Sequence, residues 1–435
     1  MAEMKRINAK FCLFICVAIS LVTLSGCQWF KHDAANPMKL QEFMAHVVEI
    51  DQAEAVVDPV KRCLSYPTPS GFQWPKALIE AMCMDMHTPV DHLPAIKRMI
   101  DAKDWAGLEA HYTDILRRHY SGEDPEYLIH RSFPIRSWKN PQEADDYTLR
   151  WLEAAPDDAY ANMTRGNLLD HRAWEARGEK SSSETDEKQM KSAMTLAKEA
   201  EILLRKASIL QPRLIPAYRT LINTQMLAGN SEKIGETFAS AIRQSPHSYY
   251  VRDTLINFLQ PKWGGSLREM DALVDESEPH VARNPRLSLL RARRVGMDGY
   301  RFLKREWYGN ALDEYRESLQ SGPEDNALAT AANLAYRERH YIQAIVYSTQ
   351  EIRFSRDNAY ALSRRGSAWE QFGERRRAYC DFRAAVEAGL GEGSVAKGRI
   401  PVLEALFVKH NIDIKTVCGP NNPDVRDLRK KLGLQ

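Results

Sequence analysis

The sequence predicts an all-α protein in which pairs of helices stack side by side into a solenoid. Apolar residues recur at the spacing of one helix face along nearly the whole chain, and the alternating pattern typical of strands is almost absent. The chain also repeats itself at a fixed period. The repeated positions are Ala200, Leu204, Ala207 and Pro212, which match Ile234, Phe238, Ala241 and Pro246. Repetition of this kind indicates units that bury a continuous core only when they are stacked.

One copy shows the repeat with particular clarity, and its sequence is DNAYALSRRGSAWEQFGERRRAYCDFRAAVEAG. Its small, aromatic and turn positions are Gly366, Trp369, Gly373, Ala378, Phe382 and Ala385. Ala344 precedes Ala378 by one period, as Ala332 precedes Gly366. The period and these positions resemble tetratricopeptide (TPR) repeats, whose unit has about 34 residues. The resemblance implies a right-handed TPR-like α-solenoid of helical hairpins, with the first helix of each pair on a concave surface.

The start of the chain has the pattern of a secretory signal. Three cations precede an apolar segment of 14 residues, Phe11 to Leu24, which is too short to span a bilayer. The following "LSGC" resembles the lipobox of bacterial lipoproteins. That resemblance implies a signal peptide at 1–26 and a lipid anchor on Cys27. Gln28 then favours the periplasmic face of the outer membrane. The alternative is an ordinary secretory signal with an incidental cysteine.

Charge and cysteine usage narrow the class of protein further. Residues 1–26 carry the whole formal charge of +2, so the remainder is neutral and has no basic footprint for nucleic acid. Four cysteines remain after Cys27, and an even number in an oxidising compartment favours two disulfides. We expect Cys63–Cys83 and Cys380–Cys418, because each pair lies at one end of the chain. Four free, buried thiols are the alternative.

The segments follow one another in a simple order. A tether and helical segment (27–91) precedes residues 92–275, which resemble a bacterial domain-of-unknown-function family that often accompanies TPR repeats. That resemblance is carried by AYANMTRGNLLDHRAWEARG, PAYRTLINTQMLAGN and LQPKWGGS. It implies no activity. A polar insertion near 177–190 interrupts this part, and the second helix resumes at about Lys191. TPR repeats (285–390) and C-terminal capping helices (391–435) complete the chain.

Catalytic and metal-binding patterns are weak. The sequence has no complete catalytic motif, so we expect neither an enzyme nor a cofactor. His87, His92, His111 and His119 fit no metal-ligand spacing, and solvated or capping histidines are the simpler interpretation. The loop at Trp263, Gly264 and Gly265 is either a binding loop or a tight connection whose tryptophan packs inward.

A row of asparagines is the strongest candidate for a binding surface. Asn167, Asn223, Asn257 and Asn333 occupy the same repeat position. Amide side chains can bond an extended peptide backbone without reading its sequence, and Arg219 could pair with a carboxylate. The alternative is that these amides bond neighbouring helices or water.

Together these patterns predict a lipid-anchored periplasmic scaffold that binds a protein or peptide partner in the bacterial envelope through its concave surface. Two rivals stay open. One is an enzyme or substrate-binding subunit with a site near the Trp263 loop or the His87–His119 cluster. The other is a structural spacer.

Overall fold

The computed structural model describes residues 38–418, except 134–137, 139, 181–183 and 356–357. Within these ranges every regular element is a helix, and twenty of them are α-helices. The predicted all-α class is therefore confirmed. The predicted signal peptide, Cys27 and the end of the chain beyond 418 lie outside the described residues.

Three short helices form an N-terminal segment, residues 38–91. They are α2 (Leu40–Glu54), α3 (Pro59–Ser65) and α4 (Lys76–His87). The lobe that follows contains α5 (Leu93–Asp101), α6 (Trp105–Ser121), α7 (Glu126–Arg131), α8 (Pro141–Ala154), α9 (Ala159–Arg177) and α10 (Glu187–Leu210). The chain then continues through α11 (Ile215–Leu227), α12 (Ser231–Gln244), α13 (Tyr249–Phe258), the short turn η2 (Pro261–Trp263) and α14 (Leu267–Ser277).

The C-terminal part repeats the same unit. After η3 (Glu278–His280) and η4 (Pro285–Leu287) come α15 (Ser288–Leu303), α16 (Tyr308–Gln320), α17 (Asp325–Arg337), α18 (Tyr341–Phe354), α19 (Ala359–Phe372) and α20 (Arg375–Glu387). The helix α21 (Val395–Lys409) and η5 (Ile414–Thr416) close the described chain. Helix α13 starts one sequence period after α11, and α19 starts one period after α17, as the repeat predicts.

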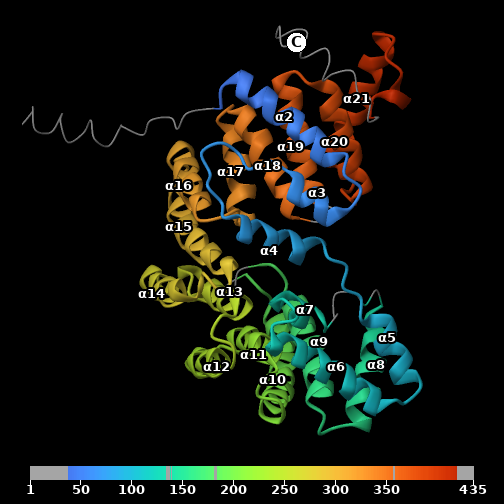
Figure 1. The fold of residues 1–435 in the computed structure, drawn as a ribbon, viewed down its shortest axis with the longest axis vertical. Coiled ribbons are helices and arrows are strands. Elements are labelled where there is room, and N and C mark those ends of the chain that lie inside the picture. Colours follow the sequence, from blue (N-terminus) through green and yellow to red (C-terminus); the bar gives the residue numbers. More distant parts are fainter. Residues whose placement is uncertain (1–37, 134–137, 139, 181–183, 356–357, 419–435) are drawn as a thin grey trace, which may run out of the picture.

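The helices form two rows. The first helices of the pairs, α9, α11, α13, α15, α17 and α19, contact one another in succession. The second helices contact their own partner and the next first helix instead. Because the first helices lie closer together, they form the inner side of a curved stack. This is the arrangement of a TPR-like solenoid (Figure 1).

A small residue at one repeated position allows the two helices of a pair to approach closely. A methyl group on Gly366 would lie 2.9 Å from the ring of Phe382, and one on Gly299 would lie 2.9 Å from the ring of Tyr315. In each pair the large residue follows the glycine by sixteen positions. Gly166 meets Leu204 in the same way, but 38 positions later, which is the same spacing plus an insertion of 22.

Much of that insertion is helical. Helix α9 has 19 residues and α10 has 24, whereas α11 and α12 have 13 and 14. The second helix resumes at Glu187, earlier than the expected Lys191. The polar residues 187–191 follow a capping aspartate, Asp186, which accepts hydrogen bonds from Lys188 and Gln189. They therefore extend the helix into solvent.

The N-terminal segment does not stand apart from the repeats. It lies across the second helices of the C-terminal pairs, beside α17 to α20 (Figure 1). Phe43 packs on Trp369 and Phe372 of α19, with ring centroids 5.8 and 5.3 Å apart. Trp74 donates to the carbonyl of Leu319 at 2.6 Å. Its aromatic and aliphatic residues belong to the same core as α15–α21, whereas α5–α10 form a second core with α11.

Both expected disulfides are present. Cys63–Cys83 ties α3 to α4, and Cys380–Cys418 ties α20 to the end of the described chain, with Cα atoms 5.6 and 5.4 Å apart. Each bond therefore fixes one end of the C-terminal core.

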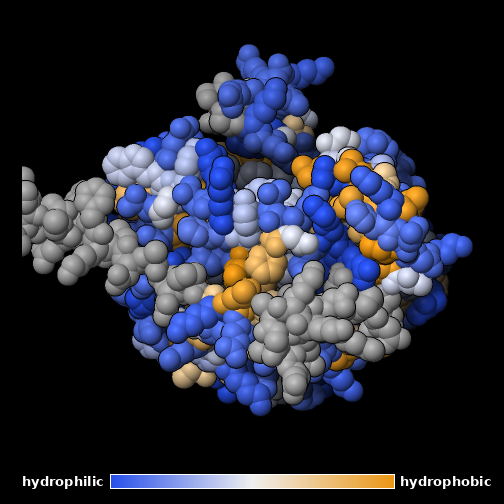
Figure 2. Space-filling model, turned by 90° about the horizontal axis from the view of Figure 1, so that it is seen from above, coloured by the Kyte–Doolittle hydropathy of each residue, from blue (hydrophilic) through white to orange (hydrophobic). Residues whose placement is uncertain are grey.

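The surface is mostly polar. Figure 2 shows the end at which α21 lies, where hydrophilic residues cover most of the face. Among the described helices, none combines the length and apolar character needed to cross a membrane.

Candidate functional site

The four predicted asparagines lie on first helices, where the repeat places them. Three of them bond an adjacent first helix. Asn223 of α11 donates to Asp170 of α9 at 2.7 Å. Asn257 of α13 accepts from Arg293 of α15 at 3.1 Å, and Asn333 of α17 accepts from Arg364 of α19 at 2.7 Å. These bonds match the neighbouring-helix alternative, and the use of the amides for a peptide stays a prediction.

Asn167 differs from the other three. It is half-buried on α9, and no hydrogen bond to its side chain occurs within the described part of the chain. One helical turn further along α9 lies Asp170, and a further turn brings Trp174. Residues at these spacings share one face of a helix. Asn167 is therefore the member of the predicted row whose amide remains available to a partner.

Asp170 is the ionisable group at the centre of this face. It is buried and accepts hydrogen bonds from Asn223 and from the hydroxyl of Thr224, at 2.7 and 2.8 Å. Burial raises the pKa of Asp170 to about 6, although the two hydrogen bonds oppose the shift. Its carboxyl thus holds α9 and α11 together.

The Trp263 loop closes one end of the same surface. Trp263 meets Trp174 edge to face with centroids 6.2 Å apart, and the guanidinium of Arg177 lies 5.5 Å from its ring centre. The indole is nevertheless 38% exposed. It thus packs on α9 and faces solvent at once. A methyl group on Gly265 would lie 2.4 Å from the carbonyl oxygen of Leu259, so this loop requires glycine.

We call this face the α9–α13 surface, and five residues define it. They are Asn167, Asp170, Trp174, Asn223 and Trp263. Arg219, the predicted carboxylate partner, donates to Thr254 at 3.3 Å and lies 5.1 Å from the ring centre of Tyr250. It is half-buried between α11 and α13.

The histidines of the rival enzyme hypothesis are spread over separate places. His92 and His111 contact each other with ring centroids 5.2 Å apart. His87 instead donates to the carbonyl of Arg353, and His119 lies beside Tyr120. Across the described ranges, no three potential ligands come together in a way that could hold a metal ion.

A buried acidic centre joins the N-terminal lobe to the later repeats. Glu126 of α7 accepts hydrogen bonds from the hydroxyl of Ser248, the backbone N–H of Tyr249 and the amide of Asn284, at 2.5, 3.0 and 2.8 Å. Burial acts to raise the pKa of Glu126, but hydrogen bonds, first of all from His130, hold it at about 2. These hydrogen bonds to the Glu126 carboxylate hold α7 against the start of α13.

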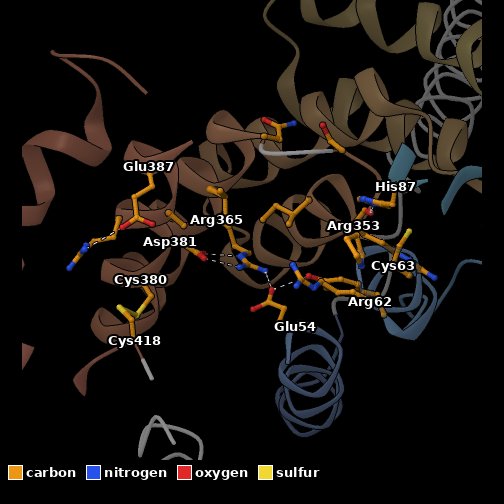
Figure 3. Close-up of a pocket in the computed structure, with 18 of the residues that line it drawn as sticks. Glu54, Arg62, Cys63, His87, Arg353, Arg365, Cys380, Asp381, Glu387 and Cys418 are labelled. Atoms are coloured by element: carbon orange, nitrogen blue, oxygen red, sulfur yellow. Dashed lines mark hydrogen bonds and ion pairs between the residues drawn. A yellow bond between two sulfur atoms is a disulfide. The ribbon is translucent and has the colours of Figure 1, made fainter. Parts of the chain in front are cut away.

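A cavity of about 780 Å³ lies between the N-terminal segment and α18–α20 (Figure 3). On one side Arg365 makes a bidentate pair with Asp381, at 2.8 and 2.7 Å, and reaches Glu54 at 2.5 Å. On the other side Arg353 donates to the carbonyl of Cys63 at 2.8 Å. Burial raises the pKa of Asp381. On the first side the arginine is paired with acids, whereas on the second side the arginine bonds a neutral carbonyl.

Arg353 is the unusual residue of that second side. Only 3% of it is exposed, yet within the described residues no carboxylate pairs with it. Burial lowers the pKa of its guanidinium to about 10. Sequence reasoning missed this residue. The sequence does contain an indication of it. Helix α18 carries only two charged residues, Glu351 and Arg353, and a helix with so few charges is expected to be buried on all sides, which would bury Arg353 as well.

Comparisons with known proteins give only distant likenesses. No family model matches this chain, and no curated protein matches it in sequence. Among solved structures it is similar to the TPR domain of P58(IPK), at 13% identity over 73% of this chain and 98% of that chain, with a TM-score of 0.28. It is also similar to the APC/C hetero-tetramer Cut9–Hcn1, at 11% identity over 83% of this chain and 68% of that chain, with a TM-score of 0.34. The fold assignment rests on the pairing and register of the helices.

Proposed function

We propose that this chain is a scaffold that binds a protein or peptide partner along the α9–α13 surface. The observation that carries the proposal is the gathering of an available amide and two partly exposed indoles on first helices and the adjoining loop. Asn167 and Trp174 share one face of α9, and Trp263, in the loop after α13, contacts Trp174. Amides bond peptide backbone, and indoles supply large contact area at little entropic cost.

The pairing of charges elsewhere supports a scaffold over the rival enzyme. Glu126 and Asp381 are buried acids, and each is held by several donors of its own chain. A general acid or base needs a lone pair or proton directed at a substrate position. Because the carboxylates of Glu126 and Asp381 are occupied by hydrogen bonds within the chain, they stabilise the packing of helices and are not directed at a substrate.

A co-purification experiment tests the surface. Asn223→Ala and Asn257→Ala are poor probes, because each removes a bond to a buried charged residue, Asp170 or Arg293. Asn167→Ala combined with Trp263→Ala removes surface groups without breaking such a bond. Asn333→Ala is the control, since it deletes the same amide at an exposed position of α17, outside the α9–α13 surface, where the bond to Arg364 is also exposed.

The partner would be recovered with the wild type and with Asn333→Ala, and lost with the double variant. Equal recovery by all three proteins would remove the α9–α13 surface as the binding site. Circular dichroism of each protein separates loss of binding from loss of fold.

We also propose that the scaffold is anchored by lipid on Cys27 to the periplasmic face of the bacterial outer membrane. The LSGC motif and the 1–26 signal pattern support this, and so do two disulfides, which form in oxidising compartments. Mass spectrometry of the mature protein would show a diacylated and N-acylated Cys27. The Cys27→Ala variant would no longer be found in the membrane fraction. An unmodified Cys27 in the wild type would refute the proposed lipid anchor.

A further inference from the structure

Two arginines in the cavity of Figure 3 lack acidic partners. Arg62 of α3 donates to the carbonyls of Val56 and Val57, at 2.7 and 3.3 Å. Arg353 of α18 donates to the carbonyl of Cys63 and the amide oxygen of Gln350, at 2.8 and 3.1 Å. All four acceptors are neutral. Within the described chain, neither guanidinium has a carboxylate within ion-pair distance.

The remaining arginines of the same cavity behave differently. Arg365 is paired with Asp381 and Glu54, and Arg383 is paired with Glu387 at 3.2 Å. Among the described residues that line the cavity, the acids are Asp381, Glu54 and Glu387, so its four arginines leave one net positive charge there. Burying an uncompensated charge is unfavourable, and an anion between Arg62 and Arg353 would relieve the cost.

Helices α3 and α18 bring Arg62 and Arg353 to the same cavity. Arg353 bonds the carbonyl of Cys63, the residue directly after Arg62, and both side chains line the cavity. Figure 3 shows them on the same side, beside His87 and opposite the Arg365–Asp381 pair. His46, buried on α2, adds no charge there, because burial lowers its pKa to about 4. The site is thus built by α3 and α18 together.

Apolar residues also line the cavity, alongside its polar and charged ones. They include Pro59, Tyr66, Pro89, Ile352 and Leu362. A volume of about 780 Å³ is in the range that holds small organic ligands. Two guanidinium groups in a cavity that also has apolar lining residues suit an anion that carries an apolar body.

We propose that the cavity between α3 and α18–α20 binds a small carboxylate with an apolar body, held by Arg62 and Arg353. Guanidinium groups bind the two oxygens of a carboxylate in a planar, bidentate geometry. Phosphate offers the same oxyanion chemistry without the apolar body. This site is separate from the α9–α13 surface and goes beyond the scaffold function.

Isothermal titration of the mature chain with three probes tests the site. N-acetyl-leucine carries a carboxylate and an apolar side chain, N-acetyl-leucinamide carries the same body without the charge, and inorganic phosphate carries the charge without the body. The variants are Arg62→Gln, Arg353→Gln and Arg383→Gln. Arg383 lines the same cavity but is already paired with Glu387, so it is the matched control.

We expect the wild type and Arg383→Gln to bind N-acetyl-leucine alike and more tightly than phosphate, with no measurable binding of the amide. Loss of one charged hydrogen-bonding group should weaken binding by about tenfold or more in Arg62→Gln. Arg353→Gln should also lose binding if the variant folds. If Arg353→Gln does not fold, Arg62→Gln alone tests the site, because Arg62 is less buried than Arg353.

Three results would overturn the proposal. They are the absence of binding of either anion to the wild type, equal affinity of Arg62→Gln and wild type, and equal affinity for the carboxylate and its amide. Phosphate binding that matches or exceeds N-acetyl-leucine binding, and that is lost in Arg62→Gln, would retain the arginine pair as an oxyanion site and refute the apolar body.

Discussion

Gly366 offers the most direct test of the helix pairing. A methyl group there would lie 2.9 Å from two atoms of the Phe382 ring and 3.1 Å from the carbonyl oxygen of Ala378. Phe382 is fully buried, so its ring has little room to move. The substitution Gly366→Ala therefore forces α19 and α20 apart or forces the ring out of its preferred position.

Two effects oppose each other in this substitution. Ala stabilises a helix interior by about 0.5–1 kcal/mol relative to Gly. Extra volume in a packed core costs about 1–3 kcal/mol. We therefore expect a net destabilisation of about 1–2 kcal/mol for Gly366→Ala. Gly235→Ala in α12 is the control, because a methyl group there has nothing within 4 Å and should stabilise by about 0.5–1 kcal/mol.

Native-state hydrogen exchange is the suitable assay, because a chain of this size does not unfold in a single step. Amides of α19 and α20 report the first variant, and amides of α12 report the control. Opposite signs of the two changes are expected. If Gly366→Ala increased protection as much as Gly235→Ala does, the close approach of α19 and α20 would be refuted.

Two further predictions concern the disulfide and the buried acid. Replacing Cys63 and Cys83 with serine opens a link of sequence separation 20 and should lower the stability of the N-terminal segment by about 3 kcal/mol, read from exchange in α2–α4. Unchanged exchange there would count against this. The pKa of Asp170 is about 6 in the folded protein, above its unfolded value, so its contribution to stability is lost as pH rises through 6. Asp170→Asn should therefore gain up to about 3 kcal/mol relative to wild type between pH 4 and 7, read from native-state exchange of amides in α9 and α11, and a constant difference would contradict the shift.

The repeat could be predicted because it depends on the spacing of residues within short segments of the sequence. Gly366, Ala378 and Phe382 fall on repeat positions, and the structure places all three at the interface of α19 and α20. Helix periodicity and small-residue positions are properties of short segments, so one sequence is enough to reveal them. The sequence did not reveal that α10 begins at Glu187, within the insertion predicted near 177–190, because polar residues occur in both exposed loops and exposed helices.

The position of the N-terminal segment could not be predicted in this way. Trp74 contacts Leu319 across 245 residues, and Arg377 pairs with Asp51 across 326. No periodic pattern encodes a contact at such separation. The disulfide pairing was predicted, but its consequence was not: Cys63–Cys83 holds the segment that supplies one wall of the cavity.

The candidate sites, too, were predictable from the sequence only where they depend on local spacing. The asparagine register followed from the period, but the groups that each amide bonds depend on neighbours brought together by the fold. Asp170 and Arg293 are such neighbours. Arg62 and Arg353 carry no local signature that distinguishes them from paired arginines, since pairing is a property of three-dimensional surroundings.

The proposed anchor would hold a different part of the molecule from the part that carries the proposed binding surface. Twelve residues lie between Cys27 and Leu40, and a chain of that length spans at most about 45 Å. An acylated Cys27 would therefore keep the start of α2 near the bilayer. Helices α2 and α21 lie at one end of the molecule, whereas α5, α6, α8 and α10 lie at the other (Figure 1). The lobe that contains Asn167 and Trp174 thus extends away from the anchored end, which favours a partner in the periplasm over one embedded in the membrane.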